Sequence, residues 1–288
     1  MVKYIEKYFR RIYLKGIIKL FKTILILIFI LCLIGAITVC YAFFIEPNQL
    51  KTEEVNISSK KLKEPVSIAV FADTHFGAGY KLENFDKVIA KINEKEVDYV
   101  IFTGDLIDNY QNYKKNTSII SSKLLNIKAK KGKYAVFGNH DYGGGAQNYY
   151  KSIMNKGGFE VLINQSVSFS KNNLKLIGVD DFLIGYGNSS IVNKENSNTY
   201  NLVICHEPDV FDNFNKDKVD LMVSGHSHGG QVNIPYLKDK ILPALGSKYT
   251  YGEYKNNNSL LYVNPGLGTT KINARLFAKP EITFFNIN

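Results

Sequence analysis

The chain has 288 residues, of which 45% are hydrophobic and 13% aromatic, and its formal net charge is +10. This length and composition suit one ordinary globular core and one additional apolar segment. The charge divides into +5 on residues 1–50 and +5 on the remainder, without a basic and aromatic stripe, so we expect no nucleic-acid partner. The three cysteines lie in apolar runs, which argues against a disulfide framework or a Cys-X-X-Cys metal site.

A basic segment at residues 1–22 precedes an uncharged apolar segment at residues 23–45. As a helix rising about 1.5 Å per residue, the apolar segment would measure about 34 Å, so we predict a single transmembrane helix. The positive-inside bias then places the N-terminus in the cytoplasm and the remainder of the chain outside it. The bases before the span are Lys3, Lys7, Arg10, Arg11, Lys15, Lys19 and Lys22.

Two alternatives stay open at this end of the chain. A cleaved signal peptide would need a shorter apolar region and an A-x-A-like exit, whereas the exit here reads YAFFIEPNQ. Ile5, Phe9 and Ile12 recur at near-helical spacing, which is typical of an amphipathic helix on the inner leaflet. A solvated basic tail would carry the same charges.

A polar linker is expected at residues 46–65, with an edge strand around residues 54–58. Residues 66–288 then alternate short apolar runs with amphipathic segments, which predicts one α/β domain. Buried strands are predicted at 66–73, 98–105, 133–140, 174–181, 201–208 and 219–226. Strands without helices between them, at 161–169, 260–264 and 281–287, are expected to form antiparallel hairpins or meanders.

Polar residues gather at the carboxyl ends of five of the six buried strands, the edge of an α/β sheet where ligands bind. All five histidines of the chain belong to this set. In chain order its members are Asp73 and His75, Asp105, Asn139 and His140, His206, and His226 and His228.

Taken singly, these motifs are weak evidence, because Asp-Thr-His can be a helix cap with a loop histidine and Gly-Asp can be a turn. The strongest is Gly225-His226-Ser227-His228, since histidines at i and i+2 of an extended chain project to the same side. Five independent coincidences at one sheet edge would be needed to explain the whole set. The sequence therefore predicts one metal site.

In order and spacing, the motifs D-x-H, GD, GNHD, H and GHxH resemble those of the calcineurin-like metallophosphoesterases, from about Val66 to the C-terminus. The N-terminal span and the words HEPD, SGHSHGGQV, NPGLGTT and KPEIT are similar to a membrane-anchored branch of that family, which resembles UDP-2,3-diacylglucosamine hydrolases. The resemblance implies a layered β-sandwich with mixed sheets, flanked by helices. It also implies a metal-dependent phosphoric ester or pyrophosphate hydrolase.

The resemblance further implies two divalent metal ions. One would be bound by Asp73, His75, Asp105 and His228, and the other by Asp105, Asn139, His206 and His226. Imidazole, carboxylate and amide ligands suit Mn, Fe, Zn or Mg. Two such ions and two carboxylates leave a charge of about +2 to hold a phosphate.

Purple acid phosphatases resemble the same pattern but have a glycine at the position of His75 and a tyrosine at the position of Asp108. We therefore do not expect a charge-transfer iron centre. Asp108 itself could touch substrate or cap the next helix, and the cap is the favoured interpretation.

The expected reaction is hydrolysis of a phosphodiester or pyrophosphate. Two ions about 3.5–4 Å apart would lower the pKa of a bridging water, and the hydroxide would attack phosphorus in line. By resemblance, His140 binds no metal and stabilises the transition state or protonates the leaving oxygen, and Asp141 orients it. A helix cap is the alternative for Asp141.

The substrate is less well defined by the sequence. A membrane tether favours a lipid-linked substrate, and aromatic residues around Tyr149 and Tyr251 could line its pocket or belong to loops and core. The alternative function is an envelope-binding protein with a structural or vestigial metal centre. The presence of His140 argues against that alternative, because a structural site would not need it.

Overall fold

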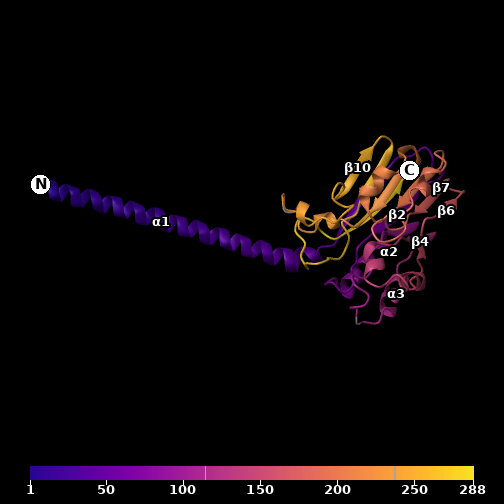
Figure 1. Ribbon diagram of the computed structural model, residues 1–288, viewed down its shortest axis with the longest axis horizontal. Helices are drawn as coiled ribbons and strands as arrows, with labels where there is room; N and C mark the ends of the chain where they lie inside the picture. Colours follow the sequence, from indigo (N-terminus) through magenta and orange to yellow (C-terminus); the bar gives the residue numbers. More distant parts are fainter. Residues whose placement is uncertain (114, 237) are drawn as a thin grey trace.

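A long N-terminal helix leads into a layered domain (Figure 1). The computed structural model describes residues 1–113, 115–236 and 238–288. Its α-helices are α1 (Val2–Cys40), α2 (Leu82–Lys95), α3 (Ser118–Leu125), α4 (Asn139–Gly143), α5 (Tyr150–Lys156) and α6 (Ser190–Asn193). Shorter helical segments are η1 (Tyr41–Ile45), η2 (Glu46–Asn48), η3 (Pro208–Asn213), η4 (Lys216–Lys218), η5 (His228–Gly230) and η6 (Lys238–Lys240).

The N-terminal helix is long and apolar enough to cross a bilayer. It continues through the π-helical η1 and the 3-10 turn η2 directly into the domain, at the place where the sequence suggested a linker. Glu46 is only 1% exposed, and its buried carboxylate accepts the Ala278 N–H at 2.7 Å. The helix is therefore fixed to the domain by a packed joint.

The strands within the described residues form two six-stranded sheets. The first has the order β1 (Lys51–Ile57), β12 (Glu281–Ile287), β2 (Val66–Phe71), β3 (Tyr99–Phe102), β4 (Gly132–Ala135) and β5 (Glu160–Val161). The second has the order β10 (Gly252–Asn256), β11 (Ser259–Val263), β9 (Leu221–Ser224), β8 (Tyr200–Ile204), β7 (Leu174–Gly178) and β6 (Gln165–Phe169). Both sheets are mixed, with antiparallel pairs at β12–β2, β10–β11 and β6–β7.

The alternation of side chains along a strand explains why the sheets stack face to face. In β2, Ile68 and Val70 point into the core between the sheets, where they meet Val223 of β9. The intervening Ala69 and Phe71 point to the outer face of the first sheet. Both faces of β2 are therefore buried, which accounts for its continuous apolar sequence.

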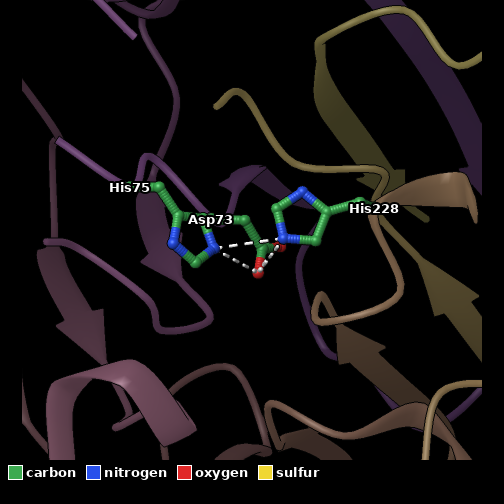
Figure 2. Close-up of side chains that lie close together, drawn as sticks. All are labelled: Asp73, His75 and His228. Carbon is green, nitrogen blue, oxygen red and sulfur yellow. Dashed lines mark hydrogen bonds and ion pairs between the residues drawn. The ribbon is translucent and has the colours of Figure 1, made fainter. Parts of the chain in front are cut away.

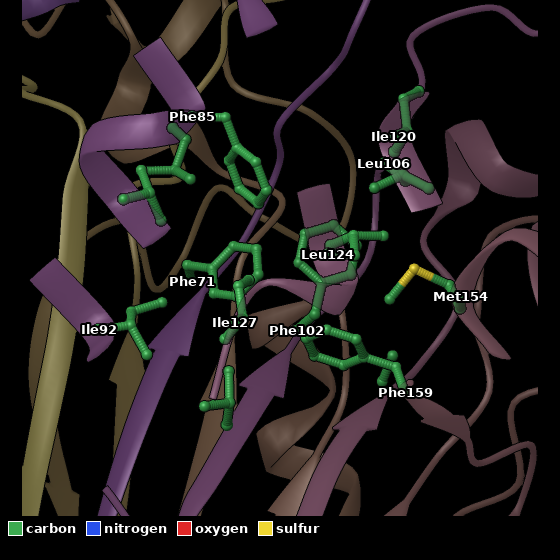
Figure 3. Close-up of a cluster of buried hydrophobic side chains, with 14 of the residues drawn as sticks. Phe71, Phe85, Ile92, Phe102, Leu106, Ile120, Leu124, Ile127, Met154 and Phe159 are labelled. Carbon is green, nitrogen blue, oxygen red and sulfur yellow. The ribbon is translucent and has the colours of Figure 1, made fainter. Parts of the chain in front are cut away.

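An aromatic cluster fills the space between the first sheet and the helices α2, α3 and α5 (Figure 3). Phe71 lies at its centre, with ring centroids 5.8 Å from Phe85, 5.0 Å from Phe102 and 6.3 Å from Phe159. Since Phe71 ends β2 and Phe102 ends β3, this packing holds the two strands immediately before the loops that contain Asp73 and Asp105.

The expected fold class, a layered sandwich with mixed sheets and flanking helices, is confirmed. One predicted strand is wrong in detail. Residues 161–169 divide between the sheets, because β5 pairs with β4 and β6 pairs with β7. Asn164, with φ of 50°, lies at the crossing. The left-handed conformation turns the chain from one sheet to the other.

We expect Phe85→Ala to lower the free energy of unfolding by about 3–5 kcal/mol, because it removes a fully buried ring from the cluster in Figure 3. Urea unfolding of the full chain in detergent measures the change. Lys91→Ala, at an exposed position of the same helix, is the control and should change the value by less than about 0.5 kcal/mol. Equal effects of the two variants would contradict the proposed packing.

Candidate metal centre

Five loops bring the predicted site residues to one edge of the sandwich. The loops after β2, β3 and β4 come from the first sheet, and those after β8 and β9 come from the second. Their polar side chains follow directly on buried apolar strands. In chain order they are Asp73, His75, Asp105, Asn139, His140, His206, His226 and His228. The structure thus brings every predicted site residue together, while their individual roles remain predictions.

The backbone of this edge is strained. Five of the residues have the left-handed conformation: Asp73 (φ 49°), His75 (φ 41°), Asp105 (φ 62°), His226 (φ 70°) and His228 (φ 53°). Each such residue costs on the order of 1–3 kcal/mol, and such strain clusters at functional sites. The packing is also tight, since a Cβ on Gly225 would lie 2.4 Å from Oδ2 of Asp73. Only glycine fits there.

One group of three side chains comes from the loops after β2 and β9 (Figure 2). Nε2 of His75 lies 3.1 Å from Nε2 of His228, and Oδ1 of Asp73 lies 3.9 and 3.8 Å from these two nitrogens. Nδ1 of His75 faces Oδ1 of Asp108 at 3.1 Å. Because a carboxylate only accepts hydrogen bonds, Nδ1 carries the proton and the lone pair of Nε2 points at His228.

A second group consists of Asp105, His206 and His226. Nδ1 of His206 donates to the Thr103 carbonyl at 2.7 Å, and Nε2 of His226 donates to the Ala244 carbonyl at 2.8 Å. The opposite nitrogens therefore present lone pairs to each other across 3.2 Å. Two lone pairs at this distance repel unless a cation or a proton lies between them, so a metal ion fits between His206 and His226. The first group fits one as well, because Nε2 of His75 presents a lone pair beside Asp73.

Asp105 lies between the two groups. Its Oδ2 is 3.4 Å from Nε2 of His75 and 3.2 Å from Nε2 of His206, the position that a bridging carboxylate would require. Oδ1 of Asn139 is buried and has no hydrogen-bond partner among the described residues. An orphaned buried oxygen is costly, and a metal ligand role would satisfy it.

Burial favours the neutral form of His226 and His228, whereas the carboxylates favour positive charge in the site. Burial lowers the pKa of His226 to about 4, with His206 as a further cause, and burial lowers the pKa of His228 well below its ordinary value. Burial raises the pKa of Asp73 to about 6, although His206 lowers it. Burial lowers the pKa of His206, but Asp105 and Asp73 together raise it well above its ordinary value. The site thus stabilises a bound positive charge.

His140 lies at the edge of these groups and lines an open pocket. Its backbone N–H donates to Oδ1 of Asp105 at 2.8 Å, and its Nδ1 donates to the carbonyl of Asp108 at 2.7 Å. Nε2 is therefore the nitrogen that is available to a ligand. His140 also lies close enough to His75 and Asp105 to form a third group that could hold a metal, so distance alone allows it to be either a ligand or a proton donor.

Asp141 has different partners from those the resemblance implied. Its carboxylate accepts the backbone N–H groups of Asp105 at 2.8 Å, Leu106 at 3.0 Å and Gly138 at 3.0 Å. It thus caps α4 and joins the loops after β3 and β4. The ring of His140 is oriented by Asp108 instead. Asp141 does not take that role because its carboxylate is already engaged by the three backbone N–H groups.

Asp108 is the residue whose importance the sequence did not reveal. It positions His75 through Oδ1 and His140 through its backbone carbonyl, and Thr270 Oγ1 donates to the same Oδ1 at 3.1 Å. A helix cap was the favoured interpretation for this residue. The sequence offered one signal for this role. Asp108 follows Asp105 by only three residues, so its side chain lies near the same edge of the sheet.

A pocket of about 370 Å³ opens over Asp105, His140 and the two histidines of the last motif. Its further walls come from the segments 230–243 and 270–272, in which no motif had been recognised. The aromatic residues that could have formed these walls lie elsewhere. Tyr149 stacks on Tyr110, and Tyr251 donates to Glu281. The pocket is lined by apolar side chains and lysines, including Val232, Lys240, Ile241, Pro243, Lys271 and Ile272.

Comparisons with known proteins relate the chain to several phosphoesterases. The model of the calcineurin-like phosphoesterase family matches residues 66–230. An uncharacterized metallophosphoesterase of Bacillus subtilis, YkuE, is 35% identical over 86% of this chain and 88% of its own length. The phosphodiesterase YaeI of Escherichia coli is 27% identical over 77% of this chain and 82% of its own. A dimetal phosphatase structure from Danio rerio has a TM-score of 0.46 at 13% identity, over 71% of this chain and 88% of that one.

We expect Asp108→Ala to weaken binding of Mn²⁺ by about 10- to 100-fold, because His75 loses the carboxylate that fixes its tautomer and orientation. Asp108→Asn keeps an acceptor oxygen and should fall between the variant and the native chain. Calorimetric titration with Mn²⁺ measures the affinity. Asp217→Ala removes an exposed carboxylate of η4 and is the control. The role given to Asp108 is incorrect if both alanine variants bind equally well.

Proposed function

Because the chain belongs to the calcineurin-like phosphoesterase family, we propose that it is a membrane-anchored dinuclear-metal hydrolase of a phosphodiester or pyrophosphate. The family is metal-dependent and hydrolyses phosphoesters, which is the general activity of this chain. The observation that carries the narrower proposal is the meeting of two adjacent groups of buried ligands at Asp105. Nε2 of His75 presents its lone pair to His228, and Nε2 of His206 faces Nδ1 of His226.

The proposed ligand sets follow those two groups. Asp73, His75, Asp105 and His228 would hold one ion, and Asp105, Asn139, His206 and His226 the other. Two bound divalent ions supply Lewis acidity to the phosphoryl oxygens and make water a nucleophile near neutral pH. The imidazole, carboxylate and amide ligands suit Mn, Fe, Zn or Mg.

His140 is proposed to act on the leaving oxygen from the edge of the site. Burial lowers its pKa, but Asp105, the Asp108 carbonyl and the Asp108 carboxylate raise it by more, so the net shift is upward. A protonated ring could donate to a leaving oxygen in the pocket that it lines. Nδ1 is held by Asp108, which leaves Nε2 to give up the proton.

A lipid-linked substrate is the class that the surroundings of the pocket favour. The pocket combines apolar side chains with Lys240 and Lys271, so it can accommodate an apolar portion and a phosphate together. Residues 23–45 are proposed to lie in the membrane, with the N-terminus in the cytoplasm and the domain on the other side. The words HEPD and NPGLGTT resemble those of UDP-2,3-diacylglucosamine hydrolases, so we propose a nucleotide-linked lipid pyrophosphate among the substrates to be screened.

We expect the full chain in detergent to hydrolyse bis(p-nitrophenyl) phosphate when Mn²⁺ is added. His140→Asn should lower kcat by about 10²- to 10⁴-fold, because the proton donor is lost, while metal content stays unchanged. His206→Asn, a change of the same kind at a proposed ligand, should lower metal content as well as activity. Elemental analysis and steady-state kinetics measure both quantities.

Two outcomes of this experiment would count against the proposal. Full activity of His140→Asn would remove the proton-donor role, and loss of metal in that variant would make His140 a ligand. Metal binding by the native chain without turnover of any phosphodiester or pyrophosphate would favour an envelope-binding protein with a structural centre.

Topology is tested separately with a reporter fused after Asn288. We expect alkaline phosphatase, which is active only outside the cytoplasm, to be active in this fusion, because the bases before residue 23 hold the N-terminus inside. A fluorescent protein that matures only in the cytoplasm is the matched reporter at the same position. Fluorescence without phosphatase activity would reverse the proposed orientation.

A further inference from the structure

The end of the N-terminal helix packs against the two segments that wall the pocket. Ala42 contacts Ala274 and Leu276, and Val232 and Ile234 pack on the same cluster. The Arg275 N–H donates to the Ala42 carbonyl at 2.9 Å. In Figure 1, the orange and yellow loops accordingly lie on the side of the domain from which α1 leaves. The pocket and the end of the helix therefore share one side of the domain.

This side exposes large apolar side chains. Tyr236 is 90% exposed, Phe277 is 70% exposed and Ile272 is 48% exposed. Ile272 lines the pocket, and Tyr236 lies in sequence between the lining residues Val232 and Lys240. Phe277 follows Leu276, which packs at the end of the helix. Phe43 and Phe44 at the end of the helix are exposed as well. Aromatic side chains gathered beside a transmembrane segment are typical of the membrane–water interface.

Charge on the same side suits anionic headgroups. Residues 270–280 contain no acidic residue, and Lys271 and Lys279 are exposed there. Lys240 is exposed on the other wall segment. Exposed bases close to a membrane surface are attracted to anionic headgroups.

The packed joint prevents the domain from turning away from the bilayer. Glu46 is buried immediately after the apolar segment and bonded to Ala278, so there is no flexible spacer between helix and domain. A helix fixed in the membrane would therefore hold the wall segments close to the membrane surface. The bilayer itself is the partner that this geometry and chemistry fit.

We propose that Tyr236, Ile272 and Phe277, which we call the rim, insert into the leaflet from which the helix emerges. The metal pocket then opens onto the lipid surface, and the phosphoester that it receives is presented by a molecule lying in that leaflet. This inference rests on the proposed insertion of α1 in a membrane and on the proposed hydrolase site.

The chain contains no tryptophan, so single tryptophans can report the depth of the rim. Full-length Tyr236→Trp and Phe277→Trp are reconstituted in phosphatidylcholine–phosphatidylglycerol vesicles. The acyl chains carry no bromine, bromine near the headgroups, which reports the rim, or bromine near the chain ends, which reports the centre of the bilayer. Bromine quenches tryptophan on contact. We expect a loss of fluorescence and a blue shift in both variants. These replacements keep an aromatic ring at exposed positions, so folding should be retained.

Two further variants separate the inference from the proposed function. Leu125→Trp stands at an exposed position at the end of α3, away from the end of α1 in Figure 1, and should not be quenched. Leu31→Trp lies within the apolar segment and should be quenched if α1 is inserted. Quenching of Leu31→Trp with rim variants no more quenched than Leu125→Trp would overturn the inference alone. A rim covered by a second copy of the chain would give that same result.

The remaining outcomes concern the premises. Absence of quenching at Leu31→Trp would overturn both membrane insertion and the rim. Hydrolysis of bis(p-nitrophenyl) phosphate is measured on the same vesicles, so loss of the hydrolase activity with an inserted rim would count against the proposed function and leave the membrane contact standing.

Discussion

The side chain of Asp105 connects most of the loops that form the site. Oδ1 accepts the backbone N–H of His140, and Oδ2 lies within 3.4 Å of the ring nitrogens of His75 and His206. Its own backbone N–H donates to Asp141. One carboxylate thus sets the separation of loops from both sheets. The left-handed backbone at Asp105 and its neighbours is tolerated because these contacts, with the packed strands behind them, leave no relaxed alternative.

The hydrophobic pattern was sufficient to predict the strands that build the site. The six buried runs became β2, β3, β4, β7, β8 and β9, because a strand buried on both faces needs an uninterrupted apolar sequence. Their polar ends were visible for the same reason. A carboxylate or histidine at the end of such a strand has few structural uses, so the set that converges at one edge could be named residue by residue.

Contacts between distant segments were not predictable in this way. The partners of Asp108 and Asp141 are set by loops that meet only after the sheets have formed, and a single aspartate has the same local preferences whether it caps a helix or orients a histidine. At Asn164 the chain crosses from the first sheet to the second, and this crossing depends on which edge strands are still unpaired. The walls of the pocket come from segments 230–243 and 270–272, whose apolar residues have no recognisable period.

The buried joint at Ala42 and Glu46 has a kinetic consequence. With α1 in a bilayer, the rigid joint would hold the metal centre at a constant height above the membrane surface. For the proposed lipid-linked substrate, an enzyme held in this way would search in two dimensions, and its rate would depend on the number of substrate molecules per unit of membrane area. Dilution of the substrate among other lipids would then slow it, whereas dilution of the whole suspension would not.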